Sequence, residues 1–341
     1  MHDDATLIAN ALQRLAGRLV LDGHAVQAVR RLSGGASQQT WAFNVTTGDA
    51  GRAHVQPLVL RRAADASGAR ALGTAGLAAE AQLIEAARAG GVPVPGVRHV
   101  LQPADGLGEG FVMDRIEGET LGRRIVRDER LAGARRVLAR QCGAAMARIH
   151  RLPAHHLLPP LRTAAARAEL DFQLGLHRSH GTARPVFELA FRWLRENAPA
   201  DVPAPVLVHG DFRNGNLMVG EEGLRAVLDW ELAHFGDPME DLGWMCVRSW
   251  RFGHGALPVG GFGTREQLFE GYTAEGGQID AERVRWWEVL GTLKWGIVCE
   301  AMVHAWLSGR ERDVEKAAIG RRASEAESDL LALLAPEEEA A

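Results

Sequence analysis

The chain has 341 residues, 46% hydrophobic and 24% charged, which is typical of a globular protein large enough for two domains or lobes. Its net charge of −4 gives no electrostatic support for a nucleic-acid or anionic-membrane partner. Its three cysteines are odd in number and far apart, which argues against a disulfide framework or a zinc site. The N-terminus lacks the apolar core of a signal peptide, so we expect a cytoplasmic protein, and the oligomeric state stays open.

The first third of the chain has the pattern of a small sheet-rich region. Leu7, Leu12, Leu15 and Leu19 have the spacing of an amphipathic helix over residues 6–20. A second helix is predicted over residues 75–89. Runs rich in β-branched and aromatic residues predict strands over 26–32, 41–45, 58–62, 99–102 and 110–113.

A loop of small residues, Ser33-Gly34-Gly35-Ala36-Ser37, separates the first two predicted strands. Glycine lets the backbone approach a ligand closely, so such a loop can place its N–H groups over phosphates. The loop lacks the G-x-G-x-x-G pattern and precedes a strand, which excludes a Rossmann interpretation. Taken alone, it also describes an ordinary hairpin turn.

The remaining two thirds of the chain are mainly helical in pattern. Val137, Cys142, Met146 and Ile149 are the core candidates of a helix over residues 131–150. Trp287 and Trp295 fit core packing better than the lining of an acceptor pocket. Further helical segments are expected within 161–200, 265–275 and 281–307.

The most informative stretch contains three oxygen-bearing side chains, each after an apolar run. Asp211 and Asn216 are five residues apart, and Asp229 follows thirteen residues later, beyond a predicted turn over residues 220–223. Carboxylate and amide oxygens are the ligands that Mg²⁺ prefers, together with water and substrate phosphates. The spacing matches the phosphoryl-transfer pattern of a catalytic Asp, four intervening residues, an Asn, and then a metal-binding Asp.

This stretch closely resembles the aminoglycoside phosphotransferase family, which has the protein-kinase-like fold. Gly210 stands where protein kinases carry Arg, and Trp230-Glu231 replaces their Phe-Gly, which points to the small-molecule branch of the fold. The residues from Leu228 to Ala233, with Gly236-Asp237-Pro238 and Asp241-Leu242, are most similar to the kinase-like module associated with acyl-CoA dehydrogenases.

The resemblance implies an α+β, bilobal fold and an ATP- and Mg²⁺-dependent activity. Residues 1–116 would form a nucleotide-covering lobe, and residues 117–341 a catalytic and acceptor-binding lobe. The implied reaction moves the γ-phosphoryl group of ATP to a hydroxyl of a small molecule.

The resemblance also implies roles for individual residues. Asp211 would orient and deprotonate the acceptor hydroxyl, while Asn216 and Asp229 would hold Mg²⁺. Arg61 stands where the family carries lysine, and Glu80 is its expected ion-pair partner; Arg62 is the alternative to Arg61. The expected nucleotide-binding residues are therefore Ser33, Gly34, Gly35, Ser37, Arg61, Glu80, Arg115 and Ile116. His209 is expected to have a structural role, and Asp241 to brace the catalytic loop.

Several alternatives stay open at this stage. The missing lysine also fits a catalytically inactive nucleotide-binding module, and AMP transfer on the same fold is a third possibility. The acceptor could be an aminoglycoside, a choline-like amine, a sugar or a hydroxylated acyl compound, and the nucleotide could be ATP or GTP.

Overall fold

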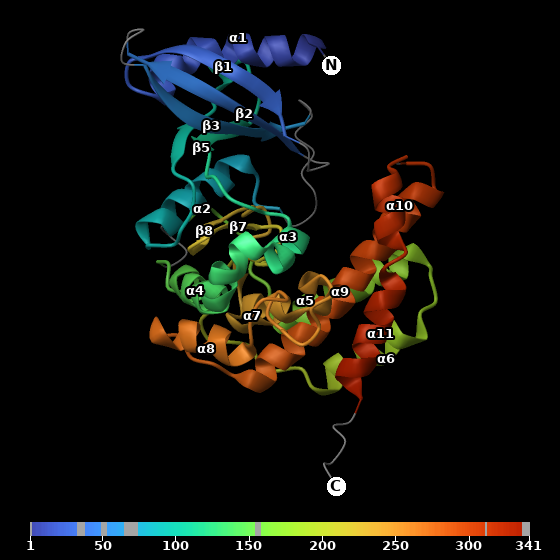
Figure 1. Cartoon of the computed structure of the whole chain (residues 1–341). Helices are drawn as coiled ribbons and strands as arrows, with labels where there is room; N and C mark the ends of the chain where they lie inside the picture. The colour runs from blue at the N-terminus through green and yellow to red at the C-terminus, as the bar shows by residue number, and fades with distance from the viewer. Residues whose placement is uncertain are drawn as a thin grey trace. The chain divides into compact units, whose positions relative to one another are not determined.

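The computed structural model describes residues 2–32, 38–48, 53–64, 74–153, 158–310 and 312–335. The chain divides into two compact units. Unit 1 comprises residues 1–118, 152–161 and 225–233, and unit 2 comprises residues 119–151, 162–224 and 234–341. The predicted α+β class is confirmed, because a five-stranded antiparallel sheet is followed by a mainly helical region (Figure 1). The predicted lobe boundary after residue 116 stays a prediction.

The sheet of unit 1 has the strand order β1-β2-β3-β5-β4. Neighbouring strands are antiparallel, and Thr40 of β2 pairs with Arg61 of β3. Leu58, Val59 and Leu60 are buried in succession, so both faces of β3 are covered. The strands are β1 (Gly23–Arg31), β2 (Gln38–Thr47), β3 (His54–Ala63), β4 (Val97–Val100) and β5 (Gly110–Asp114).

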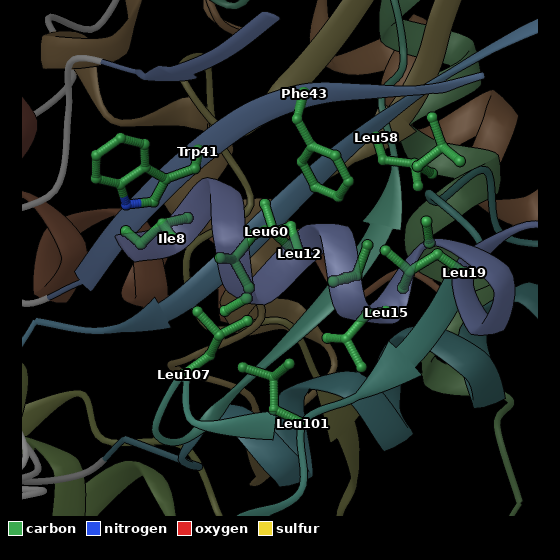
Figure 2. Close-up of a cluster of buried hydrophobic side chains, with 14 residues drawn as sticks. Ile8, Leu12, Leu15, Leu19, Trp41, Phe43, Leu58, Leu60, Leu101 and Leu107 are labelled. Carbon is green, nitrogen blue, oxygen red and sulfur yellow. The ribbon is translucent and has the colours of Figure 1, made fainter. Parts of the chain in front are cut away.

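Helix α1 (His2–Leu19) packs along one face of this sheet (Figure 1). Figure 2 shows Ile8, Leu12, Leu15 and Leu19 of α1 among the buried side chains of β2, β3 and the segment around β4. Each fully buried side chain of this kind contributes about 2 kcal/mol by leaving water. The prediction that Leu7 belongs to the apolar face of this helix is wrong. Leu7 is 66% exposed, because Ile8 takes the inward position instead.

Helix α2 (Leu77–Ala89) buries Glu80 among apolar residues. Glu80 shares the inward face with Leu83, Ile84 and Ala87, as the helical period requires. The 3₁₀ turn η1 (Pro103–Asp105) precedes β5. The segment of residues 225–233 joins unit 1 through backbone hydrogen bonds: the Val227 N–H donates to the Pro93 carbonyl (2.8 Å), and the Ala75 N–H to the Glu231 carbonyl (2.8 Å).

Unit 2 is built mainly of helices. Strands β6 (Val206–Val208) and β9 (His234–Gly236) pair antiparallel, and β7 (Leu217–Gly220) with β8 (Gly223–Val227) forms the predicted hairpin. The helices are α3 (Gly122–Arg127), α4 (Ala132–His150), α5 (Ala166–His180), α6 (Pro185–Glu196), α7 (Met239–Cys246), α8 (Arg265–Ala274), α9 (Ala281–Leu307), α10 (Val314–Gly320) and α11 (Ala323–Leu334), with 3₁₀ turns η2 (Glu129–Leu131) and η4 (Arg248–Arg251).

Helix α4 carries the predicted core residues Cys142, Met146 and Ile149 in buried positions. Val137 was also expected in the core, but it is 42% exposed, so this prediction is wrong. In the part of the chain that the structure describes, no helix is both long and apolar enough to cross a bilayer.

Two glycines allow α4 and α8 to approach backbone to backbone. A Cβ atom on Gly143 of α4 would overlap the Leu268 carbonyl oxygen of α8, and one on Gly271 of α8 would overlap the Arg140 carbonyl oxygen of α4. Because real Cβ atoms do not come so close to a carbonyl, each glycine is required for this helix spacing. The approach sets the separation of the residues that follow, His150 at the end of α4 and Tyr272 in α8.

Candidate active site

The predicted catalytic loop lies in unit 2, between β6 and β7. Leu207 and Val208 are buried in the strand that leads into it. Gly210 (φ 77°) and Gly215 (φ 105°) have positive φ angles that other residues rarely adopt. The two glycines therefore shape the loop on either side of the polar residues that it presents.

The carboxylate of Asp211 accepts hydrogen bonds on both oxygens. Its Oδ1 accepts from Arg213 Nε (2.8 Å) and from Trp244 Nε1 (2.8 Å), and its Oδ2 accepts from Asn216 Nδ2 (2.6 Å). Three donors from two directions fix the side chain in one orientation, which is what a positioned catalytic base needs. The catalytic role of Asp211 itself stays a prediction.

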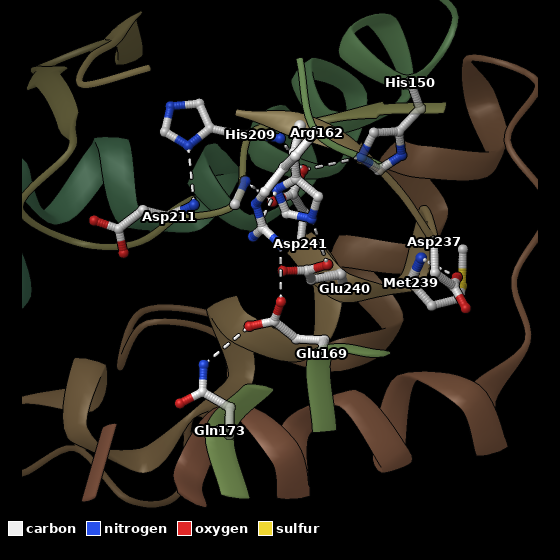
Figure 3. Close-up of polar contacts among 12 residues, drawn as sticks. His150, Arg162, Glu169, Gln173, His209, Asp211, Asp237, Met239, Glu240 and Asp241 are labelled. Atoms are coloured by element: carbon white, nitrogen blue, oxygen red, sulfur yellow. Dashed lines mark hydrogen bonds and ion pairs between the residues drawn. The ribbon is translucent and has the colours of Figure 1, made fainter. Parts of the chain in front are cut away.

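Asp241, in the first turn of α7, holds the catalytic loop through hydrogen bonds to its backbone (Figure 3). It is fully buried and accepts from the backbone N–H groups of His209 (2.8 Å) and Gly210 (2.9 Å). His150 Nε2 lies 3.0 Å from Asp241 Oδ2, and His150 Nδ1 lies 2.8 Å from the Tyr272 hydroxyl. Although burial acts to raise it, these partners hold the pKa of Asp241 below its usual value.

His209 has contacts of the structural kind that the sequence predicts. It is fully buried, and its Nδ1 accepts from the Asp211 N–H (3.3 Å). Its ring also packs edge-on against Phe212. The imidazole therefore supports the loop conformation from within the core.

A second buried polar group in Figure 3 is centred on Glu169 of α5. Its carboxylate accepts from Arg162 (3.0 Å) and Gln173 (2.9 Å). Burial alone would raise the pKa of Glu169, but Lys294, Arg162 and Gln173 outweigh burial and hold it at about 2. Glu169 therefore stays ionised although it is buried, because nearby cations and hydrogen-bond donors stabilise its negative charge.

The predicted phosphate-binding arginine lies in unit 1. Arg61 Nε is 3.2 Å from Glu80 Oε2, so the expected ion pair is present. The Arg61 guanidinium also pairs with Asp229, and it is 3.9 Å from Glu231. Arg62, the alternative, donates instead to the backbone carbonyl of Ala63.

The Arg61 guanidinium lies close to three carboxylates, those of Glu80, Asp229 and Glu231. Burial raises the pKa of Glu80 to about 7; Arg61 opposes the rise, and Asp229 and Glu231 add to it. Gln38 donates to Glu231 (2.9 Å), but it is neutral. Asp229 and Glu231 thus bring carboxylate oxygens beside this ion pair, and such oxygens suit a further cation.

The two predicted metal ligands each offer an oxygen. Asn216 donates through its amide nitrogen to Asp211, which leaves its Oδ1 as the ligand atom. Asp229 has a left-handed backbone (φ 65°), which Asp tolerates better than most residues, and its side chain is 30% exposed. Asn216 belongs to unit 2 and Asp229 to unit 1, so their pairing on one ion stays a prediction.

A Mg²⁺ ion at these residues would need further oxygens from outside the protein. Within the described residues, no group of three or more His, Cys, Asp or Glu side chains could hold a metal. Mg²⁺ characteristically takes one or two protein oxygens and completes its shell with waters and substrate phosphates. Asn216 and Asp229 fit that pattern of few protein ligands.

Of the remaining predicted nucleotide-binding residues, the structure describes Arg115 and Ile116. The Arg115 N–H already donates to the Pro57 carbonyl (3.1 Å), so the Arg115 carbonyl and the Ile116 backbone are the groups left for an adenine edge. Ser33, Gly34, Gly35 and Ser37 lie outside the described residues.

Sequence reasoning did not identify three residues that contact this site. Trp244 lies three residues after Asp241 on the same helix, a spacing that places both on one face and could have indicated it. Arg213, two residues after Asp211, was visible as a nearby cation. Tyr272 is the only tyrosine of the chain, but nothing local connects it with His150.

Comparison with known proteins gives a family match over most of the chain. The model of the family described as Phosphotransferase enzyme family (APH) matches residues 28–287. Acyl-CoA dehydrogenase family member 11 of Rattus norvegicus is 30% identical over 163 residues, 45% of this chain and 20% of the rat protein. Member 10 of Mus musculus is 42% identical over 65 residues, 18% of this chain and 6% of that protein. This chain thus matches at most about a fifth of the length of these relatives.

Solved structures share the fold at low sequence identity. A candidate aminoglycoside phosphotransferase from Ralstonia eutropha JMP134 has a TM-score of 0.71 at 18% identity, covering 95% of this chain and 97% of that one. A choline/ethanolamine kinase family protein from Mesorhizobium loti has a TM-score of 0.63 at 22% identity, covering 99% and 96%. A ternary complex of APH(4)-Ia with AMP-PNP and hygromycin B has a TM-score of 0.58 at 16% identity, covering 96% and 98%.

Proposed function

Because the chain belongs to the phosphotransferase enzyme family, we propose that it transfers the γ-phosphoryl group of ATP to a hydroxyl of a small molecule. The observation that carries the proposal is the environment of Asp211. Its carboxylate is oriented by Arg213, Trp244 and Asn216 in a loop that Asp241 braces. A side chain held this firmly is suited to receive a proton from an oriented alcohol.

In the proposed reaction, Asp211 orients the acceptor hydroxyl and takes its proton. The acceptor oxygen forms a bond to the γ-phosphorus, the bond from that phosphorus to the β,γ-bridging oxygen breaks, and ADP leaves. Such transfer asks little covalent chemistry of the protein, so positioning and charge stabilisation supply most of the rate.

The nucleotide is proposed to be bound mainly by unit 1. Arg61, oriented by Glu80, would contact the phosphates, and its planar fork suits phosphate oxygens. Residues Ser33 to Ser37 would cover the phosphates with backbone N–H groups, and the backbone of Arg115 and Ile116 would contact the adenine edge. The carboxylate of Asp229 beside Arg61 supports a cation as part of the bound nucleotide.

Asn216 and Asp229 are the proposed Mg²⁺ ligands. The ion would supply charge neutralisation for the phosphate oxygens. Among structural neighbours, the APH(4)-Ia complex holds an ATP analogue together with a small molecule, which supports the same pair of ligand classes for this chain.

The first experiment tests Asp211. We expect Asp211→Asn to lower the rate of phosphoryl transfer by about 10³-fold, because no base remains to receive the hydroxyl proton. Binding of AMP-PNP, measured by calorimetry, should be retained. Asp171, an exposed aspartate of α5, supplies the control: Asp171→Asn should leave both quantities unchanged. Wild-type turnover by Asp211→Asn would exclude the proposed role.

A second experiment tests the metal ligands without relying on turnover. Mg²⁺ should increase the AMP-PNP-dependent rise in melting temperature of the wild type, and Asp229→Asn should remove most of that increment. An unchanged increment would show that Asp229 is no ligand.

The product identity separates the remaining candidates. ADP formation supports the proposal, and AMP formation with a nucleotide attached to the acceptor indicates AMP transfer instead. Nucleotide binding with no product on any hydroxylated acceptor indicates an inactive module, which the arginine at position 61 motivates.

A further inference from the structure

Three tryptophans of unit 2 form a connected group that begins at Asp211, and each has a cation over its ring. Trp244, which donates to Asp211, is 5.2 Å from Trp250 between ring centroids, and Trp250 is 4.9 Å from Trp295. The cations are Lys294 over Trp244 (5.1 Å), Arg213 over Trp250 (4.6 Å) and Arg322 over Trp295 (5.6 Å). We call these six residues the tryptophan–cation cluster.

The cluster contains hydrogen-bond donors that are not used within the protein. Trp250 is 4% exposed, and its buried Nε1 has no partner among the described residues; the same is true of Nε1 of Trp295. Because these N–H groups are buried, what the cluster offers a ligand is the positive charge of its cations.

The cluster continues into a cavity of about 430 Å³, a size typical of small-molecule sites. Arg248 and Ser249 of η4 line one side, and Arg322, Glu325, Ser328 and Asp329 line the other. Trp250 follows Ser249 directly, and Arg322 covers Trp295, so the cluster and the cavity share a wall.

Buried hydrogen bonds connect this wall of the cavity to the catalytic loop. Asn214, fully buried in that loop, donates through Nδ2 to the Trp250 carbonyl (3.2 Å) and is also bonded to the Gly260 carbonyl (2.6 Å). The spacing between Asp211 and the cavity is therefore fixed by buried hydrogen bonds.

Two arginines of the cavity keep guanidinium nitrogens for a ligand. Arg248 meets Asp329 through Nε (3.4 Å), and Arg322 meets Glu325 through Nε (2.9 Å). The terminal nitrogens of both have no bond to any residue that the structure describes. Arg248 and Glu325 are well exposed, and exposed ion pairs contribute at most about 1 kcal/mol, so a ligand anion can displace them.

The third cavity arginine has a different use. Arg251 donates to the carbonyls of Cys246 and Gly255 and pairs with buried Glu288 (3.0 Å). Its guanidinium is committed to holding the wall, which leaves Arg248 and Arg322 as the ligand-facing pair.

We propose that the acceptor carries a carboxylate or phosphate group, which Arg248 and Arg322 bind, while its hydroxyl reaches Asp211. This inference rests on the proposed phosphotransferase function and assigns its substrate class. Bidentate guanidinium contacts favour planar or tetrahedral oxyanions, and the cations over the tryptophans disfavour an ammonium group in the same place.

The test uses four compounds of equal length that differ in one end group. These are ω-hydroxyoctanoate, hydroxyoctyl phosphate, the α,ω-octanediol and ω-aminooctanol, each titrated by calorimetry into the full chain with and without AMP-PNP. We expect at least one of the two anions to bind about tenfold more tightly than the diol, and the amine to bind most weakly. The tighter anion identifies carboxylate or phosphate as the recognised group.

Matched variants localise the binding. Arg322→Gln and Arg248→Gln should each lower anion affinity about three- to tenfold and leave diol and AMP-PNP affinities unchanged. Arg321→Gln, an exposed arginine one residue earlier, is the control and should bind like the wild type. Should Arg322→Gln melt early, Arg248→Gln alone decides, because that side chain is 59% exposed.

The outcomes separate this inference from the proposed function. Equal or tighter binding of the amine, no anion binding at millimolar concentration, or an anion preference that survives both substitutions would overturn the anion site. Anion preference with no phosphorylated product would support the site and count against the transfer activity. Phosphorylation that favours aminooctanol would support the activity and overturn the site.

Discussion

Glu80 in unit 1 and Glu169 in unit 2 are both buried beside an arginine, yet their pKa values move in opposite directions. Burial raises the pKa of Glu80 to about 7, whereas the pKa of Glu169 falls to about 2 despite burial. Each has an arginine within 3.2 Å, so the nearest ion pair does not explain the difference.

The difference comes from the number of charges around each pair. Glu80 shares Arg61 with Asp229 and Glu231, and the charges of these two carboxylates add to the rise of its pKa. Glu169 has two cations near it, Arg162 and Lys294, and both lower its pKa. The first arrangement attracts a cation and the second stabilises a fixed carboxylate, which matches a proposed nucleotide–metal region and a structural support, respectively.

Removing Arg61 should have the largest effect, because three carboxylates lose the guanidinium that they share. We expect Arg61→Ala to lower the free energy of unfolding by about 4 kcal/mol at pH 8. The loss should be smaller at pH 5, because Glu80, with a native pKa of about 7, is then protonated and needs no partner. Urea unfolding at the two pH values measures this.

Arg62→Ala is the matched control for that prediction. Arg62 donates to the backbone of Ala63, so its loss should cost less than 1 kcal/mol, or about the net value of one hydrogen bond, at either pH. Similar losses in the two variants would mean that the charge imbalance around Glu80 has no energetic consequence.

Neutralising Glu169 should have the next largest effect, with the opposite pH dependence. Its native pKa of about 2 lies below the unfolded value near 4.5, so its contribution is present above pH 4.5 and is lost as the pH falls toward 2. We expect Glu169→Gln to lower the free energy of unfolding by about 3 kcal/mol at pH 7. The difference from the wild type should shrink between pH 4.5 and pH 3; a constant difference would contradict the assignment.

Tyr272→Phe should have the smallest effect, because it removes one hydroxyl at the far end of the Asp241 network. We expect a loss of about 1 kcal/mol in unfolding free energy. The turnover number should fall with little change in KM for ATP, because His150 loses the partner that orients it toward Asp241. An unchanged turnover number would show that the Tyr272 hydroxyl is not needed to orient His150 toward Asp241.

Local patterns were sufficient to predict most of the fold. Strands β2 and β3 follow from runs of β-branched and aromatic residues, and the inward position of Glu80 on α2 follows from the helical period. Position Leu7 was predicted wrongly because Ile8 competes for the same face of α1, and Val137 because an apolar residue on a surface helix does not have to face the core.

The contacts of the candidate site also divide into those that local motifs predict and those that depend on helix packing. The pair of Arg61 and Glu80 and the brace by Asp241 could be placed from the resemblance of nearby motifs. The contacts from Trp244 to Asp211 and from Tyr272 to His150 join residues 33 and 122 positions apart, and they depend on how helices pack. No local spacing specifies such contacts, so only the structure shows them.

Because α4 and α8 cross closely at Gly143 and Gly271, substitutions at these two glycines should affect turnover. A methyl group at either glycine would push the two helices apart and lengthen the reach from Tyr272 to His150. A random mutagenesis library selected for loss of turnover should therefore recover alanine at these two glycines, although neither residue touches a catalytic side chain. A survey restricted to pocket-lining positions would overlook both.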